Sequence, residues 1–448
     1  MSLMSAYDYY TSIGDKTNAD KYDQSKTAGD SLNPAVIRSY KDFKEAETQY
    51  NTDNLYRSFL QVADIDFSKN ESTRISISAS FPTLYVGEYY DFNGYKWVNI
   101  LVRMNPSISN YYIKPSAIQF YCGSDTYQET FIKNLIIENF IFSGSNYGSC
   151  LAIRAGNRYN NTKVNITNPY ISVVLDTKKQ NCCYSSVFLI NDPDSSSSGS
   201  TFSSIIIQNM FLKISGFVNT AAPLKNSYNN SRSYRQGGPL SSLIFGYSKA
   251  GETINDSCPN MSSNFNTKCK LIDSTIFYND LNMNFADIDF MSNPGNYGYG
   301  NTIVPFIPTT SCLHLTGKIN AIGTENNDGF STARNSPCLL MSDYYSTISS
   351  LFVDFEFDTS GLTKAPEDAF KLLTSAYCEG NTSVYDGSID ASLKNTIYVN
   401  STKLNPDNTK LFTQRNNIIF LTDEQMKDPS YLLSKGFTCF SISDETIK

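Results

Sequence analysis

The chain has 448 residues, of which 40% are apolar, 13% aromatic and only 18% charged, and its formal net charge is -7 at pH 7. The modest, dispersed acidity and the lack of a basic stripe exclude a nucleic-acid-binding surface of the usual kind. The shortage of charged residues, offset by Asn, Ser, Thr and Tyr, is typical of stacked strands with many corners and not of solvated helices.

The sequence gives little sign of membrane targeting. Residues 1–30 are polar, with neither a basic start nor an apolar stretch, so no signal peptide is predicted. No stretch reaches the roughly 18 apolar residues of a membrane span. We therefore expect a protein made in the cytoplasm and placed on a virion or cell surface. A native signal trimmed ahead of Met4 is the alternative.

The chain contains ten cysteines without C-x-x-C spacing, and His314 is its one histidine. A zinc site needs a closer set of thiolates and imidazoles, so we predict neither a metal nor a cofactor. The cysteines are interpreted as buried small apolar residues or reduced thiols, and a bridge between Cys258 and Cys269 is the alternative for a secreted protein.

Two different segments precede the first long apolar run. Residues 1–34 are polar and broken by glycine and proline, which predicts either a disordered segment or an anchor that contacts other virion or surface proteins. An anchor would use its tyrosines, Tyr7, Tyr9, Tyr10 and Tyr22. Residues 35–55 read as a short strand and a helix over Lys41–Gln49, which together would cap an open sheet end.

From Tyr56 to Ile100 the pattern changes to short strands separated by polar corners. Asp64 and Asp66 follow each other at strand spacing and are expected to share one face. Asn93-Gly94 predicts a tight turn. Strands without intervening helices favour stacked coils over a hairpin meander.

These residues resemble a known family. The segments Ala63–Phe67, Asp91–Tyr95 and Asn99–Ile100 are similar to the opening coils of right-handed parallel β-helix proteins of the pectin-lyase-like superfamily, among them bacterial repeat adhesins and phage fibre and tail-spike proteins. The chain departs from that pattern at Phe92, where a glycine is usual. The resemblance implies a solenoid, and for fibres it implies association into a trimer.

The body of the chain repeats a motif. Leu135–Phe142 aligns with Ile205–Leu212, about 70 residues later, which predicts about three coils of roughly 23 residues. Asn139 and Asn209 would stand at corners, where asparagine tolerates a left-handed φ. Two buried strands of a sandwich are the alternative.

Further strands are predicted along the rest of the chain: Tyr170–Leu175, Ser186–Ile190, Leu271–Phe277, Leu313–Ile322, Ser350–Phe357, Thr396–Val399 and Asn417–Leu421. Long loops rich in Ser, Asn and Gly separate them, and such loops often carry function. Those aromatic and arginine residues that suit a glycan ligand or a subunit interface are Arg232, Tyr234, Arg235, Tyr297 and Tyr299. The Ala-Asp-Ile-Asp-Phe sequence of the first coil recurs at Ala286–Phe290.

Residues 422–448 predict a short helical segment and a closing strand. Thr422 and Gln425 form a capping box, and Asp428-Pro429 begins a second turn of helix. The same segment resembles the end of the repeat region in β-helix adhesins.

The strongest catalytic candidates are Asp354, Glu356 and Asp358, which alternate along one strand. Glycoside hydrolysis needs two carboxyl groups about 5–10 Å apart, a spacing that positions i and i+2 provide. The alternative is an ordinary strand that buries its phenylalanines and exposes its acids. The motifs of polygalacturonase-like enzymes, and nucleophile motifs around His314, are not found.

The sequence therefore predicts an all-β fold: a right-handed parallel β-helix over residues 56–421, with a helical cap before it and a small helical segment after it. We expect a non-enzymatic attachment protein, such as a phage or prophage fibre or spike that binds a surface ligand. A secreted adhesin and a polysaccharide-cleaving tail spike are the alternatives.

Overall fold

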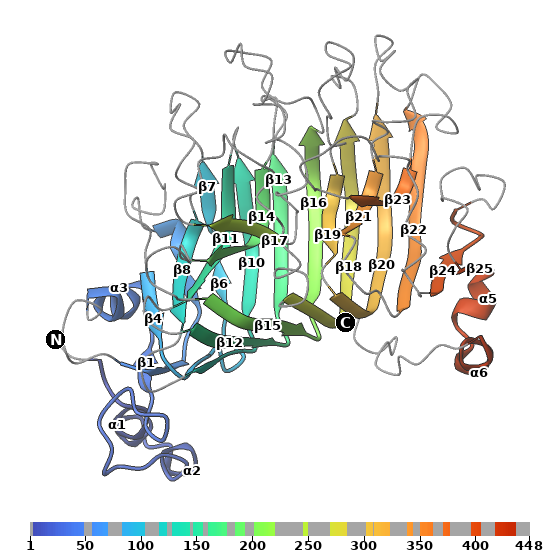
Figure 1. Cartoon of the computed structure of the whole chain (residues 1–448). Helices are drawn as coiled ribbons and strands as arrows, with labels where there is room; N and C mark the ends of the chain where they lie inside the picture. Colours follow the sequence, from blue (N-terminus) through green and yellow to red (C-terminus); the bar gives the residue numbers. More distant parts are fainter. Residues whose placement is uncertain are drawn as a thin grey trace.

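A computed structural model gives the fold of the chain. It describes residues 3–48, 56–69, 83–103, 116–122, 128–143, 147–155, 160–176, 184–192, 201–219, 245–249, 269–284, 302–307, 309–322, 338–343, 350–361, 371–376, 396–404 and 417–435. Long parallel strands stand side by side, with helices at the two ends (Figure 1).

The N-terminal residues form a folded cap. Its elements are α1 (Ala6–Ser12), α2 (Lys16–Ala19), β1 (Ala35–Ile37) and α3 (Tyr40–Thr48). Ser5 and Asp15 begin the first two helices by accepting hydrogen bonds from the backbone N–H groups of Asp8 and Asn18. The prediction of disorder is therefore wrong for residues 3–34.

Apolar side chains hold this cap against the first strands. Ala6, Tyr10 and Ala19 pack with Val36 of β1 and with Leu60 and Val62. The ring of Tyr10 stacks on that of Tyr22, with centroids 5.9 Å apart. Tyrosines expected to contact another protein therefore contact this chain. The sequence pattern of residues 1–34 does not predict this packing, because the few apolar residues of the segment contact residues outside it, up to Val62.

The strands form three rows in which every pairing is parallel. The first row contains β1, β2 (Ser58–Gln61), β5 (Tyr89–Asp91), β9 (Glu129–Lys133), β12 (Asn160–Thr167) and β15 (Thr201–Gln208). The second contains β3 (Ile65–Asp66), β6 (Trp97–Val98), β10 (Ile136–Ser143), β13 (Tyr170–Asp176), β16 (Phe211–Asn219), β22 (Ser350–Gly361), β24 (Thr396–Asn400) and β25 (Asn417–Leu421).

Two long strands, β18 (Cys269–Asn284) and β20 (Thr309–Ile322), continue both of these rows. β7 (Leu101–Arg103) pairs with the second half of β10, and a 3-10 turn, η2 (Phe67–Lys69), follows β3.

The third row is made of two separate sheets. One contains β4 (Thr83–Val86), β8 (Ser116–Cys122), β11 (Tyr147–Ala155), β14 (Tyr184–Asp192) and β17 (Phe245–Lys249). The other contains β19 (Thr302–Ile307), β21 (Cys338–Asp343) and β23 (Lys371–Ala376). The chain visits the three rows in the same order repeatedly, and every strand predicted between Tyr170 and Leu421 is confirmed.

The spacing of the repeat differs from the prediction. Ile137 pairs with Ile171, and Ile171 pairs with Leu212. These successive partners are 34 and 41 residues apart, within the range of solenoid repeats but well above roughly 23. Elsewhere the separation varies, from 21 residues between Thr396 and Asn417 to 64 between Phe211 and Thr275. The first aligned motif lies in β10 and the second runs from β15 into β16, so slightly less than two turns of the chain separate them and not three.

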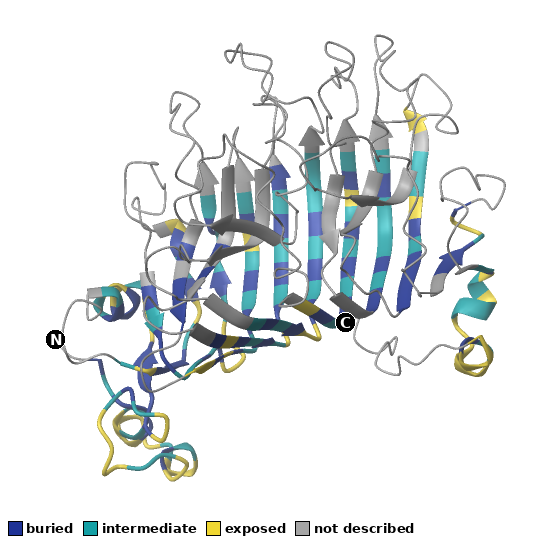
Figure 2. Cartoon of the chain, in the orientation of Figure 1, coloured by how far each residue is buried: buried dark blue, intermediate teal, exposed yellow. Residues whose placement is uncertain are grey.

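Alternation along each strand separates the core from the outside. In β13, Ile171, Val173 and Leu175 are buried while Tyr170 and Val174 are half-buried. This two-residue period recurs in neighbouring strands, as the banded colouring of Figure 2 shows. Apolar residues on the inner side are stacked in register, so each strand buries its side chains on those of the next.

A cluster of aromatic rings seals the N-terminal end of the core. Trp97 is fully buried, with the rings of Phe43, Phe92 and Phe120 at 5.8, 4.8 and 5.7 Å. Phe43 comes from α3, so this helix contributes a ring to the cluster at the end of the stack. The carbonyl of Met4 accepts a hydrogen bond from the N–H of Val36, and the carbonyl of Pro34 accepts one from the N–H of Ala6. These bonds place residues of the cap on the outer edge of β1.

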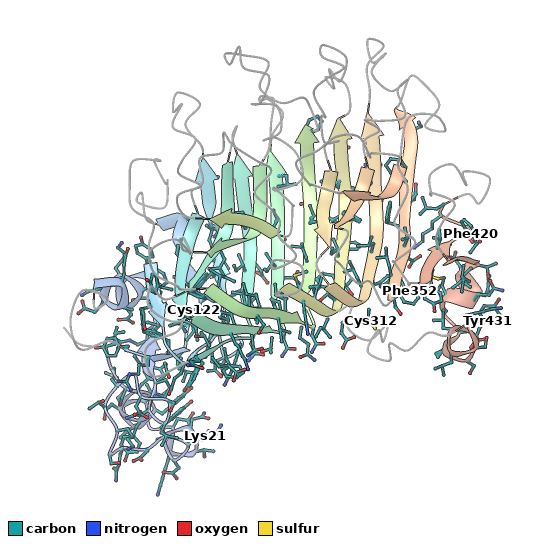
Figure 3. The ribbon with its side chains drawn as sticks, viewed as in Figure 1. Lys21, Cys122, Cys312, Phe352, Phe420 and Tyr431 are labelled. Carbon is teal, nitrogen blue, oxygen red and sulfur yellow. The ribbon has the colours of Figure 1, made fainter. Side chains whose placement is uncertain are left out.

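Two short helices cover the other end. α5 (Asp423–Met426) begins with the predicted capping box of Thr422 and Gln425, and α6 (Pro429–Ser434) begins at Asp428. Leu432 of α6 packs against Phe352 and Tyr398, on the outward side of the second row; Figure 3 labels Phe352, Phe420 and Tyr431 in this region. The closing strand predicted after Gly436 lies outside the described residues.

Candidate functional site

The three acidic side chains of β22 were the catalytic candidates. Val353 and Phe355, which alternate with them, are buried, so Asp354, Glu356 and Asp358 project to the outward side together. Glu356 is exposed, and the other two are half-buried. The alternation along this strand is therefore as predicted.

Asp354 is the centre of a polar network that joins four strands or turns. Its Oδ2 lies 3.3 Å from Nε2 of His314 on β20, and its Oδ1 accepts hydrogen bonds from Nδ2 of Asn400 at 2.7 Å. Nζ of Lys403 lies 2.9 Å from the same Oδ1 and donates to the backbone carbonyl of Asp354. Asn400 also donates to Oδ1 of Asp423 at 2.6 Å. This set, called here the Asp354 network, ties α5 and the turn after β24 to β22.

The electrostatics of these acids do not suit a general acid. Burial raises the pKa of Asp354, but its hydrogen bonds with His314, Lys403 and Asn400 outweigh burial and hold the pKa below its usual value. Hydrogen bonds from Ser360 lower the pKa of Asp358. Glu356 and Asp358 share an ion pair with Lys318, at 2.9 and 3.4 Å.

A glycosidase needs one carboxyl group with a raised pKa, which stays protonated near neutral pH and donates its proton to the leaving group. Here Asp354 and Asp358 are shifted in the opposite direction. Within the described residues, the Asp354 network is a satisfied cluster that locks the C-terminal helices to the sheet.

The predicted ligand-binding residues cannot be placed against this network. Arg232, Tyr234, Arg235, Tyr297 and Tyr299 lie outside the described residues, as does the repeated pentapeptide Ala286–Phe290. They remain predictions.

Asparagine residues form ladders at the corners between strands. Nδ2 of Asn168 donates to Oδ1 of Asn134 at 3.1 Å, and Nδ2 of Asn209 donates to Oδ1 of Asn168 at 3.0 Å. The ladder starts at Asp91, which accepts from Asn134 at 3.1 Å. All three asparagines have a left-handed φ, between 53° and 56°. This is the first ladder.

A second ladder runs from Asp66 through Asn99 to Asn139, with contacts of 3.1 and 2.7 Å. Asn139 and Asn209, which the sequence aligned, therefore stand in different ladders although both have a φ of 56°. The alignment matched corners of different ladders because each turn of the chain carries both corners only a few residues apart, as at Asn134 and Asn139. Asn99, Asn134 and Asn168 were missed; an Asn directly before or within an apolar run is the signal that would have found them.

The remaining structural residues lie near the cap. Asp64 accepts a hydrogen bond from the N–H of Lys96 at 3.1 Å but lies before β3, not in one strand with Asp66. Asn93 and Gly94 have φ values of 50° and 82° and form the predicted turn, closed by the N–H of Tyr95 on the carbonyl of Phe92.

Two cysteines are described in enough detail to compare with the prediction. Cys122 is a free thiol, fully buried, and burial raises its pKa. Cys312 is disulfide-bonded, which differs from the interpretation as reduced thiols. Its φ of 58° places it at a corner, next to Asp273 at 47° and in line with the first ladder.

Over the part of the chain that the structure describes, no three His, Cys, Asp or Glu side chains are arranged to hold a metal ion. None of the helices described is long and apolar enough to cross a bilayer. No family model matches the sequence, and no curated protein or solved structure matches it.

Proposed function

We propose that this protein is a non-enzymatic attachment protein, built as a right-handed parallel β-helix and placed on a phage or prophage particle as a fibre, spike or decoration component. The observation that carries the proposal is the fixed order in which the chain returns to three rows of parallel strands, in register from one turn to the next. In a parallel β-helix each coil contributes one strand to each of three faces.

The ends of the stack support a scaffold role. The cap occupies the outer edge of β1, and α5 and α6 cover the outward side of β22 to β25. Such a stack is a stiff body whose loops present ligand-binding side chains, and a trimer is the assembly that the resemblance to fibre proteins implies. The predicted glycan-binding residues would act from those loops.

A second candidate, a secreted bacterial adhesin, is favoured by one observation. Cys312 is disulfide-bonded, and disulfides form and persist in oxidising compartments and on cell surfaces. The two candidates share the fold and the attachment role and differ in where the protein is displayed.

Attachment is tested by incubating the labelled protein with intact bacteria and with their purified surface polysaccharides, while reducing ends are assayed. We expect saturable binding without new reducing ends. Release of sugar that is lost in Glu356→Gln would instead establish a glycan-cleaving spike. Immunogold labelling of purified particles and of cell envelopes separates the phage protein from the adhesin.

A further inference from the structure

The outward side of the second row carries an apolar surface between β10 and β18. Its residues are half-buried, although they face away from the core that their strand neighbours fill. We call them the outer panel: Ile136, Ile141, Tyr170, Val174, Phe211 and Phe277. Figure 2 shows teal bands, which mark half-buried residues, along the strands of the second row. Among the described elements, no helix packs against these strands.

The rings of the outer panel stack on one another. The rings of Tyr170 and Phe211 lie 5.6 Å apart at an interplanar angle of 3°, and Phe277 continues the stack at 6.3 Å. Sugar recognition by aromatic residues needs an open ring face, and here the stacked faces of Tyr170, Phe211 and Phe277 cover one another. The accessible part of these half-buried side chains instead suits aliphatic side chains of a partner.

The same side of this row is covered by helix farther along the chain. In register, the line through Phe211 continues through His314 to Phe352 and Tyr398. There, Leu432, Met426 and Tyr431 from α5 and α6 pack over it. The chain thus shows what this surface accepts: leucine, methionine and tyrosine side chains from a helix.

The size of the outer panel decides between a helix and a larger partner. Four strands at about 4.8 Å and five residues at about 3.3 Å give roughly 300 Å². A stable pair of protein chains buries about 800 Å² on each partner, so the panel is too small to hold a second copy by itself. It accommodates one face of a helix of three to four turns, about 16–22 Å long and 10 Å wide.

The charge of Lys213 indicates which kind of helix would bind the outer panel. Lys213 lies within the panel, opposite Phe277 in register, and no described carboxylate forms an ion pair with it. Lys96 and Glu138, by contrast, neutralise each other at 2.8 Å beside Ile136. A partner that carries an acidic residue beside its apolar stripe would pair with Lys213.

We propose that the outer panel binds an amphipathic helix of a partner protein, with an acidic residue facing Lys213. Strands repeat at about 4.8 Å and helical turns at about 5.4 Å, so a helix lying across the strands places one apolar side chain on each of three or four successive strands. The outer panel includes none of the residues predicted to bind a ligand, and it extends the protein's contacts beyond its proposed attachment role.

The test uses the full chain and a fluorescein-labelled helical peptide of about four turns, with leucines along one stripe and glutamates beside it. We expect saturable binding by fluorescence anisotropy, weakened about tenfold or more by Phe211→Ser. Phe131→Ser is the matched control, because Phe131 is an exposed aromatic residue of β9 in the first row. It should leave the affinity unchanged.

A charge exchange keeps the test decisive if Phe211→Ser unfolds the sheet. A peptide with lysines in place of the glutamates should bind the wild-type protein more weakly. Its affinity should be restored when it binds the Lys213→Glu variant. An oligosaccharide should not compete. The proposal is overturned by a peptide that fails to bind up to about 1 mM, by equal losses in the Phe211 and Phe131 variants, or by displacement of the peptide by sugar.

Discussion

Asn168 combines two properties that the corners of this stack require. Its φ of 53° lies in the left-handed region, which costs most residues about 1–2 kcal/mol, and its amide links Asn134 to Asn209 through two hydrogen bonds. Glycine supplies the first property without the second. Side-chain ladders of this kind fix the register between turns of the chain, because a slip by one residue would break every contact.

Replacing Asn168 separates these contributions. Asn168→Ala should lower the free energy of unfolding by about 2–4 kcal/mol, because it loses the ladder contacts and meets the left-handed penalty. Asn168→Gly should lose about half as much. Urea denaturation measures both. Asn165→Ala, three residues earlier within β12, is the control, because it loses one exposed hydrogen bond to Glu129 and meets no left-handed penalty. Equal effects of alanine at the two positions would contradict a special role for the corner.

The lowered pKa of Asp354 predicts how the stability of the protein depends on pH. Its folded-state pKa is below the unfolded value, so its contribution to stability is present above about pH 4 and is lost as the pH falls through the folded pKa. Asp354→Asn should therefore be less stable than wild type at pH 7, and the difference should shrink below about pH 4. Thermal denaturation between pH 3 and 7 measures this, and a constant difference would contradict it.

The boundaries of α5 and α6 could be predicted because local residues set them. The capping box at Thr422 and the proline after Asp428 act within a few residues of sequence. Coil spacing could not be predicted in this way, because a strand's partner lies between 21 and 64 residues away and only the finished register identifies it. The sequence singled out Asp354 as a catalytic candidate but predicted no network around it, because Asn400 and Lys403 reach it only after β24 pairs with β22.

Two adjacent leucines in α6 provide a test of how this helix packs on the second row of strands. Leu432 is 7% exposed against Phe352 and Tyr398, whereas Leu433 is 48% exposed. Leu432→Ala should cost about 2–4 kcal/mol by leaving a cavity, while Leu433→Ala should cost under about 0.5 kcal/mol. Chemical denaturation monitored by tyrosine fluorescence compares them. Similar losses for both variants would show that α6 is not packed as described.

Taken as a whole, the molecule depends on its N-terminal cap in a way that its polar composition did not reveal. The sequence suggested an anchor or a disordered segment, but residues 3–34 pack on β1 and occupy its outer edge. Core-forming strands were predictable from alternation; a cap held by a few scattered apolar residues was not. Removing it would expose an unpaired parallel edge.

Deletion of residues 1–34 should therefore produce heterogeneous, larger species in light scattering, through edge-to-edge association. A trimer that survives the deletion unchanged would place the assembly interface on the stack. A clean monomer in the truncated protein, derived from a trimeric wild type, would instead make the cap the assembly element.

The direction of the strand pairing also determines how the protein responds to mechanical force. The cap and the C-terminal helices lie at opposite ends of the stack (Figure 1), and the hydrogen bonds between strands run from one end toward the other. A pull between the two ends therefore opens these bonds one turn at a time, as a zipper opens, and not all at once in shear. A turn of about 35 to 40 residues would release roughly 120–140 Å of extended chain, and the turn of 64 residues between Phe211 and Thr275 would release roughly 210–230 Å. Pulled in this way, the protein would lengthen in steps whose sizes follow the lengths of its successive turns.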